Sequence, residues 1–135
     1  MNNKWNDSLA VGHGDIDEQH KALFEQFAKL KAAIDSKAPN EVLSETLSFI
    51  GDYVAKHFET EETLMEKHGY PDIMTHKAEH MAFRAMYKQH KKNVDSGNIQ
   101  SGQATIIYTW LVHWLNEHIG KTDKSLGEFV SKKAG

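Results

Sequence analysis

The chain has 135 residues, enough for one domain with a buried core of its own. Hydrophobic residues make up 39% and charged residues 26%, and the net charge of −3 argues against nucleic acid or an anionic membrane surface as a partner. The absence of cysteine excludes disulfides, iron–sulfur clusters and thiolate zinc sites. No segment has the apolar character of a signal peptide or a membrane span, so we expect a cytoplasmic protein.

The first half of the chain carries two long stretches with helical periodicity, after a polar arm over about residues 1–14. Over about residues 15–37, apolar side chains recur every three or four positions, which predicts an amphipathic helix. The break "KAPN" ends this pattern, and the same spacing resumes over about residues 41–67. Gly69 and Pro71 predict the end of the second helix, because glycine permits a left-handed cap and proline cannot continue a helix.

The second half of the chain repeats this organisation. Helices are predicted over about residues 73–95 and 104–120, separated by a loop that contains "DSGNIQSGQ". No segment shows the alternation of apolar and polar residues that is typical of a half-buried strand. Four amphipathic helices joined by short connections predict an all-α fold, an up-down-up-down antiparallel four-helix bundle, with residues 1–135 as a single domain.

Five histidines fall on the apolar stripes that the four helices should turn inward. Two acids accompany them: Glu61 lies one turn after His57 on the same face, and Asp123 follows His118 by five residues. An unpaired carboxylate inside a bundle is strongly unfavourable, and a bound cation removes that penalty. Seven donors are too many for one tetrahedral zinc, but they suit two octahedral-like ions that share carboxylates. The seven candidate metal ligands are His20, His57, Glu61, His76, His80, His118 and Asp123.

The other polar residues of interest receive a structural interpretation. Four histidines are interpreted as loop or surface residues, or as residues behind the ligands: His13, His68, His90 and His113. Glu62 is rotated by about 100° from the acid that precedes it, so we expect its side chain to face solvent.

The segment between His118 and Asp123 predicts a local irregularity. Residues five apart on a regular helix are rotated by about 140° from each other, so an undistorted helix cannot point both side chains at one metal pair. Gly120 lies between them and permits a different backbone path. We therefore expect a π-bulge or a short irregular turn in this segment.

Four motifs together resemble the hemerythrins, most closely the single-domain bacterial members: "IDEQH", "HFETEE", "GYP" with "HKAEH", and "WLNEHIGKTD". The resemblance runs from Trp5 to about Phe129 and includes all seven candidate ligands. It implies that the arm packs across the bundle through Trp5 and Leu9. It also implies a non-haem di-iron centre with an oxo or hydroxo bridge, in which one iron is held by His76, His80 and His118, the other by His20 and His57, and both by Glu61 and Asp123.

The function that the resemblance implies is reversible dioxygen binding, for oxygen storage, delivery or sensing, by a protein that is not an enzyme. Dioxygen is expected at the iron with only two histidines, which has an open coordination position. Apolar side chains near the ligands are expected to line a small, dry oxygen pocket: Leu23, Phe58, Trp114 and Leu115. The sequence contains no Glu-x-x-His motif, which argues against a di-iron oxidase of the ferritin-like type.

Two other classes stay open. One is a di-iron enzyme with weak peroxidase or nitric oxide-handling activity at the same open position, and the other is a metal-free or zinc-loaded structural bundle. We expect dioxygen as the ligand, an oxygen-consuming enzyme as a candidate partner, no nucleic acid or membrane partner, and a monomer.

Overall fold

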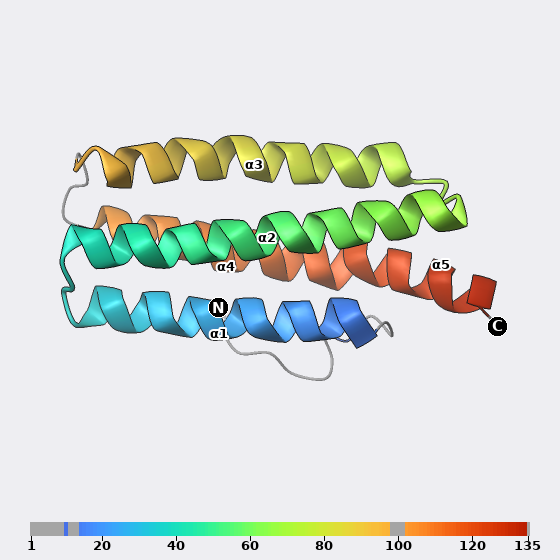
Figure 1. Cartoon of the computed structure of the whole chain (residues 1–135), viewed down its shortest axis with the longest axis horizontal. Helices are drawn as coiled ribbons and strands as arrows, with labels where there is room; N and C mark the ends of the chain where they lie inside the picture. Colours follow the sequence, from blue (N-terminus) through green and yellow to red (C-terminus); the bar gives the residue numbers. More distant parts are fainter. Residues whose placement is uncertain (1–9, 11–13, 98–101, 135) are drawn as a thin grey trace.

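Four long helices form the body of the protein. The structure, a computed structural model, describes residue 10 and residues 14–97 and 102–134, and none of these residues lies in a strand. The helices lie side by side and alternate in direction (Figure 1), which confirms the predicted all-α four-helix bundle: α1 (Gly14–Asp35), α2 (Asn40–His68), α3 (Ile73–Asp95) and α4 (Gln103–Glu117). The predicted N-terminal arm, with Trp5 and Leu9, falls outside the described residues except for Ala10 and Gly14.

The connection between α2 and α3 is short and well capped. Gly69 ends α2 in the left-handed conformation, with φ 63° and ψ 43°. The backbone N–H of Tyr70 donates to the carbonyl of Met65 at 2.9 Å, which satisfies one of the last carbonyls of α2. Because α3 turns back at once, His76 comes beside α2, with its Nε2 3.5 Å from Glu61 Oε1.

The C-terminal part of the bundle is longer than the single helix predicted over residues 104–120. A π-helix, η2 (His118–Asp123), follows α4 directly, and α5 (Lys124–Ala134) continues from it. The predicted break in regular geometry between His118 and Asp123 is therefore confirmed. The prediction missed α5, although the buried Leu126 and Val130 have helical spacing.

The buried apolar side chains form two clusters. The main cluster fills the bundle from its α1–α2 end to the middle, and the smaller cluster lies where α5 packs near the start of α1 and the end of α2. The smaller cluster consists of Ile16, Met65, Tyr70, Leu126 and Val130. Members of the main cluster include Leu23, Phe27, Ile50, Phe58, Phe83, Leu111, Leu115 and Ile119.

A layer of buried polar residues separates the two clusters. On α1, His20 lies between Ile16 of the smaller cluster and Leu23 of the main cluster. Two other segments also place a buried acid between residues of the two clusters. Glu61 lies between Phe58 and Met65 on α2, and Asp123 lies between Ile119 and Leu126 in the η2–α5 segment. The fold therefore brings buried polar residues of α1, α2, α3 and the α4–η2–α5 segment to one level of the bundle. Apolar side chains enclose this level on both sides.

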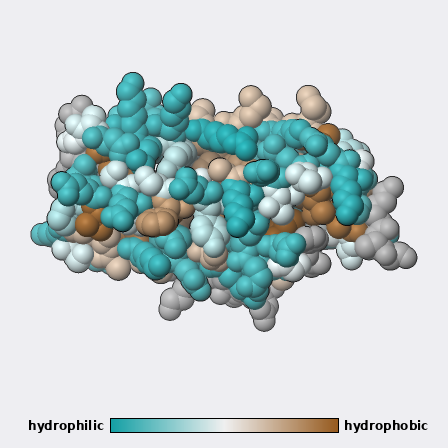
Figure 2. All heavy atoms as spheres, viewed as in Figure 1, coloured by the Kyte–Doolittle hydropathy of each residue, from teal (hydrophilic) through white to brown (hydrophobic). Residues whose placement is uncertain are grey.

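The outside of the bundle is mainly hydrophilic on the face that Figure 2 shows. The weakly hydrophobic spheres along its upper edge stand where α3 runs, and α3 exposes the three methionines Met74, Met81 and Met86. Within the part of the chain that the structure describes, no helix combines the length and the apolar character needed to cross a membrane.

Candidate metal centre

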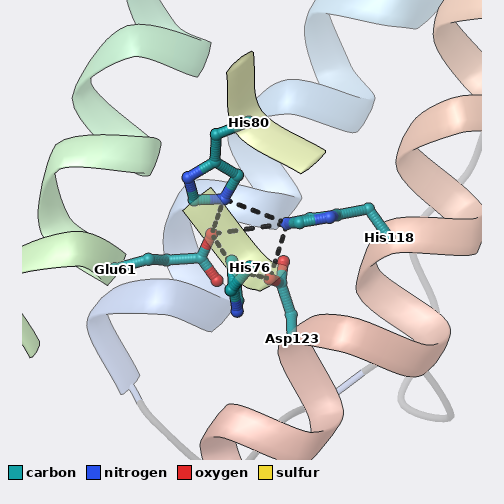
Figure 3. A group of neighbouring side chains, drawn as sticks. All are labelled: Glu61, His76, His80, His118 and Asp123. Atoms are coloured by element: carbon teal, nitrogen blue, oxygen red, sulfur yellow. Dashed lines mark hydrogen bonds and ion pairs between the residues drawn. The ribbon is translucent and has the colours of Figure 1, made fainter. Parts of the chain in front are cut away.

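One group of buried donors is contributed by three helical rods. Glu61, His76, His80, His118 and Asp123 each offer one ligand atom, and these atoms lie within 4.8 Å of one another. Figure 3 shows the five side chains pointing toward one another. His118 Nε2 lies 2.9 Å and His76 Nε2 3.2 Å from Asp123 Oδ1, while His80 Nε2 lies 3.2 Å from Glu61 Oε1. We refer to these residues as the three-histidine group.

A second group shares its two acids with the first. His20, His57, Glu61 and Asp123 also place their ligand atoms within 4.8 Å of one another. His20 Nε2 lies 2.9 Å from Asp123 Oδ2, and His57 Nε2 lies 3.2 Å from Glu61 Oε1. Asp123 thus directs Oδ1 to the three-histidine group and Oδ2 to this two-histidine group. All seven residues predicted from the sequence are brought together, and each is at most 2% exposed.

The π-helix explains how His118 and Asp123 reach the same centre. In η2 the backbone hydrogen bonds span five residues instead of four, so a residue and the fifth one after it come closer to the same face than on an α-helix. An α-helix would rotate the two side chains apart. Gly120 itself has no positive φ, and a Cβ there would meet no atom within 4 Å, so the glycine expected to cause the irregularity is not sterically required.

Hydrogen bonds outside the centre determine which ring nitrogen faces inward. His80 Nδ1 donates to Glu62 Oε2 at 2.8 Å, and His57 Nδ1 donates to Gln19 Oε1 at 3.0 Å. Gln19 donates its own N–H to Thr60, which leaves its oxygen for the histidine. A neutral imidazole with its proton on Nδ1 carries a lone pair on Nε2, so both rings direct an electron pair into the centre.

These lone pairs converge on one another, which is unfavourable unless a cation or a proton lies between them. The Nε2 atoms of His20 and His57 are 3.0 Å apart, and those of His80 and His118 are 3.2 Å apart. Glu61 Oε2, Asp123 Oδ1 and His76 Nε2 are buried and make no hydrogen bond of good geometry, although Asp123 Oδ1 lies close to two ring nitrogens. Imidazole nitrogens and carboxylate oxygens in this arrangement fit divalent transition-metal ions.

The carboxylates strongly favour protonated histidines when the centre holds no cation. Burial alone lowers the pKa of His57, but Glu61 and Asp123 outweigh burial and raise this pKa to about 9. Burial likewise lowers the pKa values of His76 and His118, and the same acids raise them to about 9 and about 11. Burial raises the pKa values of Glu61 and Asp123, yet the neighbouring imidazoles hold both below the usual range. Protons therefore compete with metal ions for the ring nitrogens.

Sequence reasoning missed the acids behind the centre. Glu62 was expected to face solvent, but its side chain is only 23% exposed because it reaches His80 and approaches Arg84. Glu79 accepts hydrogen bonds from the Thr122 hydroxyl at 2.8 and 3.0 Å, and its Oε1 lies 3.4 Å from His118 Nδ1. Glu79 follows His76 by three residues, and this spacing could have indicated from the sequence that the two side chains lie on the same side of α3.

The four residues expected around an oxygen pocket lie on the side of the centre that the main cluster occupies. Leu23, Phe58 and Leu115 are fully buried in the main cluster, and Trp114 packs against that cluster. Phe58 stacks on His80 at 3.7 Å between ring centroids and lies 6.0 Å from His57. Trp114 stacks on His118 at 4.6 Å, which places it against the three-histidine group.

The remaining histidines of the described residues do not belong to either donor group. His113 is exposed, and His68 is partly buried at the end of α2. His90 packs against Trp110 at 4.8 Å, and burial lowers its pKa. His13 lies outside the described residues.

The bundle and its two buried donor groups define a helical protein whose interior can hold metal ions. The model of one protein family, described as the hemerythrin HHE cation binding domain, matches residues 11–130. The chain belongs to the hemerythrin family.

Known relatives resemble this chain over most of its length. It is 35% identical over 118 residues to a bacteriohemerythrin of Methylococcus capsulatus, covering 87% of this chain and 88% of the relative. It is 32% identical over 120 residues to a myohemerythrin of Theromyzon tessulatum, covering 89% and 87%. A crystal structure of wild-type hemerythrin matches with a TM-score of 0.84 and 32% identity, covering 95% of this chain and 97% of that one. The relatives are named as hemerythrins and not as enzymes, in agreement with the expectation that this chain is not an enzyme.

Proposed function

We propose that the protein reversibly binds dioxygen at a non-haem di-iron centre, for oxygen storage, delivery or sensing. The observation that carries this proposal is the convergence of five buried imidazoles on two shared carboxylates, in a chain of the hemerythrin family. In the proposed centre, His76, His80 and His118 hold one iron and His20 and His57 hold the other. Glu61 and Asp123 bridge the two ions together with an oxo or hydroxo group.

The asymmetry of the donor set supports oxygen binding at one end of the centre. Two ferrous ions supply the redox chemistry, since together they can donate two electrons to dioxygen. The donor groups offer three histidines to one ion and two to the other, so an ion held by His20 and His57 would keep a position for a small ligand. The donor set contains only two carboxylates, with two negative charges for two ions, and the other five donors are neutral imidazoles.

The surrounding residues exclude water from the proposed site. Phe58 and Leu115 are fully buried, and Leu23 is buried one turn after His20. A dry apolar wall admits dioxygen, which is itself apolar, and disfavours water and anions that would compete for the metal. We propose that Leu23, Phe58, Trp114 and Leu115 provide this wall.

The proposal extends to the organisation of the protein. We propose that residues 1–135 form a single domain that acts as a cytoplasmic monomer, with an oxygen-consuming enzyme as a candidate partner. The match of the family model to residues 11–130 supports the single domain. Sedimentation of the iron-loaded chain tests the monomer, and a mass of two chains would contradict it.

Anaerobic reconstitution with ferrous iron tests the oxygen-binding function directly. The loaded protein should develop a visible absorption band in air and lose it under vacuum, over repeated cycles. A band that bleaches irreversibly while a reductant is consumed would instead indicate a di-iron enzyme. Binding of fewer than two irons per chain would indicate a structural bundle.

Substitution of single histidines tests the assignment within the centre. His20→Ala should lower the iron content from two toward one per chain and abolish the oxygen-dependent band, because the two-histidine group loses half of its imidazoles. His113→Ala, at an exposed histidine of α4, is the matched control and should behave as the parent chain. Full oxygen binding by His20→Ala would overturn the assignment.

A further inference from the structure

A solvent-open pocket of about 370 Å³ reaches the three-histidine group from the α5 end of the bundle. It lies between the start of α3 and the η2–α5 segment. Its lining residues all carry a polar group, with two acids, three aliphatic hydroxyls, one phenol and one lysine around a histidine: Tyr70, Asp72, Thr75, His76, Glu79, Lys121, Thr122 and Ser125. The pocket therefore connects solvent with a proposed iron ligand.

His76 differs from the other two histidines of its group. His80 is held by Glu62 at Nδ1, and His118 Nδ1 lies beside Glu79. His76 is only 1% exposed, yet its Nδ1 has no hydrogen-bond partner among the described residues. In Figure 3 one nitrogen of the His76 ring points away from the other four side chains. Its ring can therefore turn toward the pocket without breaking a hydrogen bond at Nδ1.

The carboxylates of the pocket suit a cation. Asp72 is exposed beside His76, and its side chain makes no capping hydrogen bond to α3. Glu79 lines the pocket and also contacts His118, so it joins the pocket to the buried centre. The only lysine of the lining, Lys121, pairs with Glu117 at 3.0 Å, which offsets its positive charge.

A second pocket, at the other end of α3, has the opposite chemistry. Its volume is about 730 Å³, and three of its six lining residues are lysines, Lys88, Lys91 and Lys92. A divalent cation is repelled by such a surface and attracted by the acidic one. Charge therefore distinguishes the pocket beside His76 as a route for metal ions.

We propose that the pocket beside His76 is the port through which ferrous ions enter the buried centre. Asp72 attracts the hydrated cation, Glu79 and His76 bind it at the inner end, and the His76 ring passes it to the other four residues of the three-histidine group. No bond to carbon changes in this step, since water molecules leave the ion as protein donors replace them, and a proton on the binding nitrogen of His76 passes to solvent through the open pocket. This inference rests on the proposed iron centre, but it concerns the route and rate of loading and not the final site.

The rate of metal uptake by the full metal-free chain tests this route without any use of oxygen. Ferrous iron is mixed anaerobically with the protein, and free ions are captured by a coloured chelator at successive times. Cobalt(II), added alone, gives an independent signal through its visible absorption in a protein site. Ser125→Trp fills the pocket, and Thr105→Trp places the same side chain on an exposed position of α4 as a control.

Ser125→Trp should slow uptake by about tenfold or more, because ions must then wait for local opening of the bundle. Asp72→Asn should slow uptake about threefold at low ionic strength, and the difference should disappear at high salt. Asp52→Asn, an exposed acid on α2 that does not line the pocket, should have no effect, like Thr105→Trp. The final number of ions per chain should equal that of the parent chain in all four variants.

Parent rates in both Ser125→Trp and Asp72→Asn would overturn the route. If Ser125→Trp fails to fold, the rate and salt dependence of Asp72→Asn decide alone, since asparagine preserves the shape of the side chain. A parent chain that binds no metal would contradict the proposed centre. If both variants bind the parent number of ions at the parent rate, the result would contradict the port but not the proposed centre.

Discussion

At the residue scale, side chains behind the proposed ligands control the direction in which the imidazoles point. Glu62 accepts a hydrogen bond from Nδ1 of His80, and Gln19 accepts one from Nδ1 of His57. Glu79 lies beside Nδ1 of His118. The partners of His80 and His118, in the three-histidine group, are carboxylates, whereas the partner of His57 is a neutral amide. A carboxylate makes an imidazole a stronger electron donor, so the iron of the three-histidine group should be the more tightly held.

Removal of one such partner should weaken the metal centre measurably. Glu62→Ala is expected to lower the affinity for ferrous iron by about tenfold or more, because His80 loses the acceptor that fixes its ring. Glu62→Gln should retain most of the affinity, since an amide oxygen still accepts the hydrogen bond. Competition with a chelator of known affinity measures both. Glu66→Ala, an exposed acid on the same helix, is the control, and equal affinities in Glu62→Ala and the parent would contradict this role.

Six of the seven candidate residues could be found from the sequence because each lies on the inward stripe of a predicted helix. Asp123 lies beyond the helix predicted over residues 104–120, and its role followed from the resemblance to the hemerythrins. Glu62 could not be found, because its helical angle alone predicts an exposed side chain. Its position is decided by the neighbouring helix, since His80 and Arg84 of α3 both approach its carboxylate. Periodicity within one helix contains no information about the register between two helices.

At the scale of single elements, the π-helix η2 depends on the residues at its ends and not on its glycine. Gly120→Ala should leave the iron content unchanged and alter the free energy of unfolding by less than about 1 kcal/mol, because a Cβ there meets open space. Urea denaturation and iron analysis check both values. A variant with fewer than two irons per chain would show that the turn requires glycine.

Gly51 in α2 is the opposite case. A Cβ at this position would collide with the ring and hydroxyl of Tyr87, whose hydroxyl donates to the Leu47 carbonyl at 2.6 Å. Gly51→Ala should therefore lower the free energy of unfolding by up to about 2 kcal/mol, despite the higher helix propensity of alanine. The same change in a Tyr87→Leu background should be neutral or stabilising. A more stable Gly51→Ala single variant in urea would contradict the packing.

The boundaries of the elements show where sequence reasoning ends. Gly69 and Pro71 predict the end of α2 because their backbone preferences are local. The break at η2 was predictable because two side chains five apart had to face one centre. The extension into α5 was missed, because its helical stripe is short and acquires its stability by packing on Ile16 and Met65.

At the scale of the whole molecule, a polar layer between two apolar clusters makes the stability of the bundle depend on protons and metal. In the metal-free protein, the pKa values of His57 and His76, about 9, and of His118, about 11, exceed the ordinary 6.5. The protonated histidines therefore stabilise the folded state fully below pH 6.5, and this contribution is lost as the pH rises through their raised pKa values. The depressed pKa values of Glu61 and Asp123 stabilise the fold above their ordinary values, and this contribution is lost as the pH falls.

The metal-free protein should consequently be most stable between about pH 4.5 and 6.5, with a lower thermal midpoint at pH 9. Iron should reverse the alkaline trend, since metal ions replace protons on the ring nitrogens and bind more tightly as the pH rises. Thermal denaturation with and without iron across this range measures both effects. A metal-free midpoint that rises steadily from pH 6.5 to 9 would contradict the electrostatic account.

Above all, we propose that seven buried side chains form one centre for two iron ions. The most direct test is the iron content per chain after anaerobic titration with ferrous iron and removal of unbound metal. The account predicts a sharp end point at two ions per chain. An end point at one ion, or uptake that rises without a break, would contradict it.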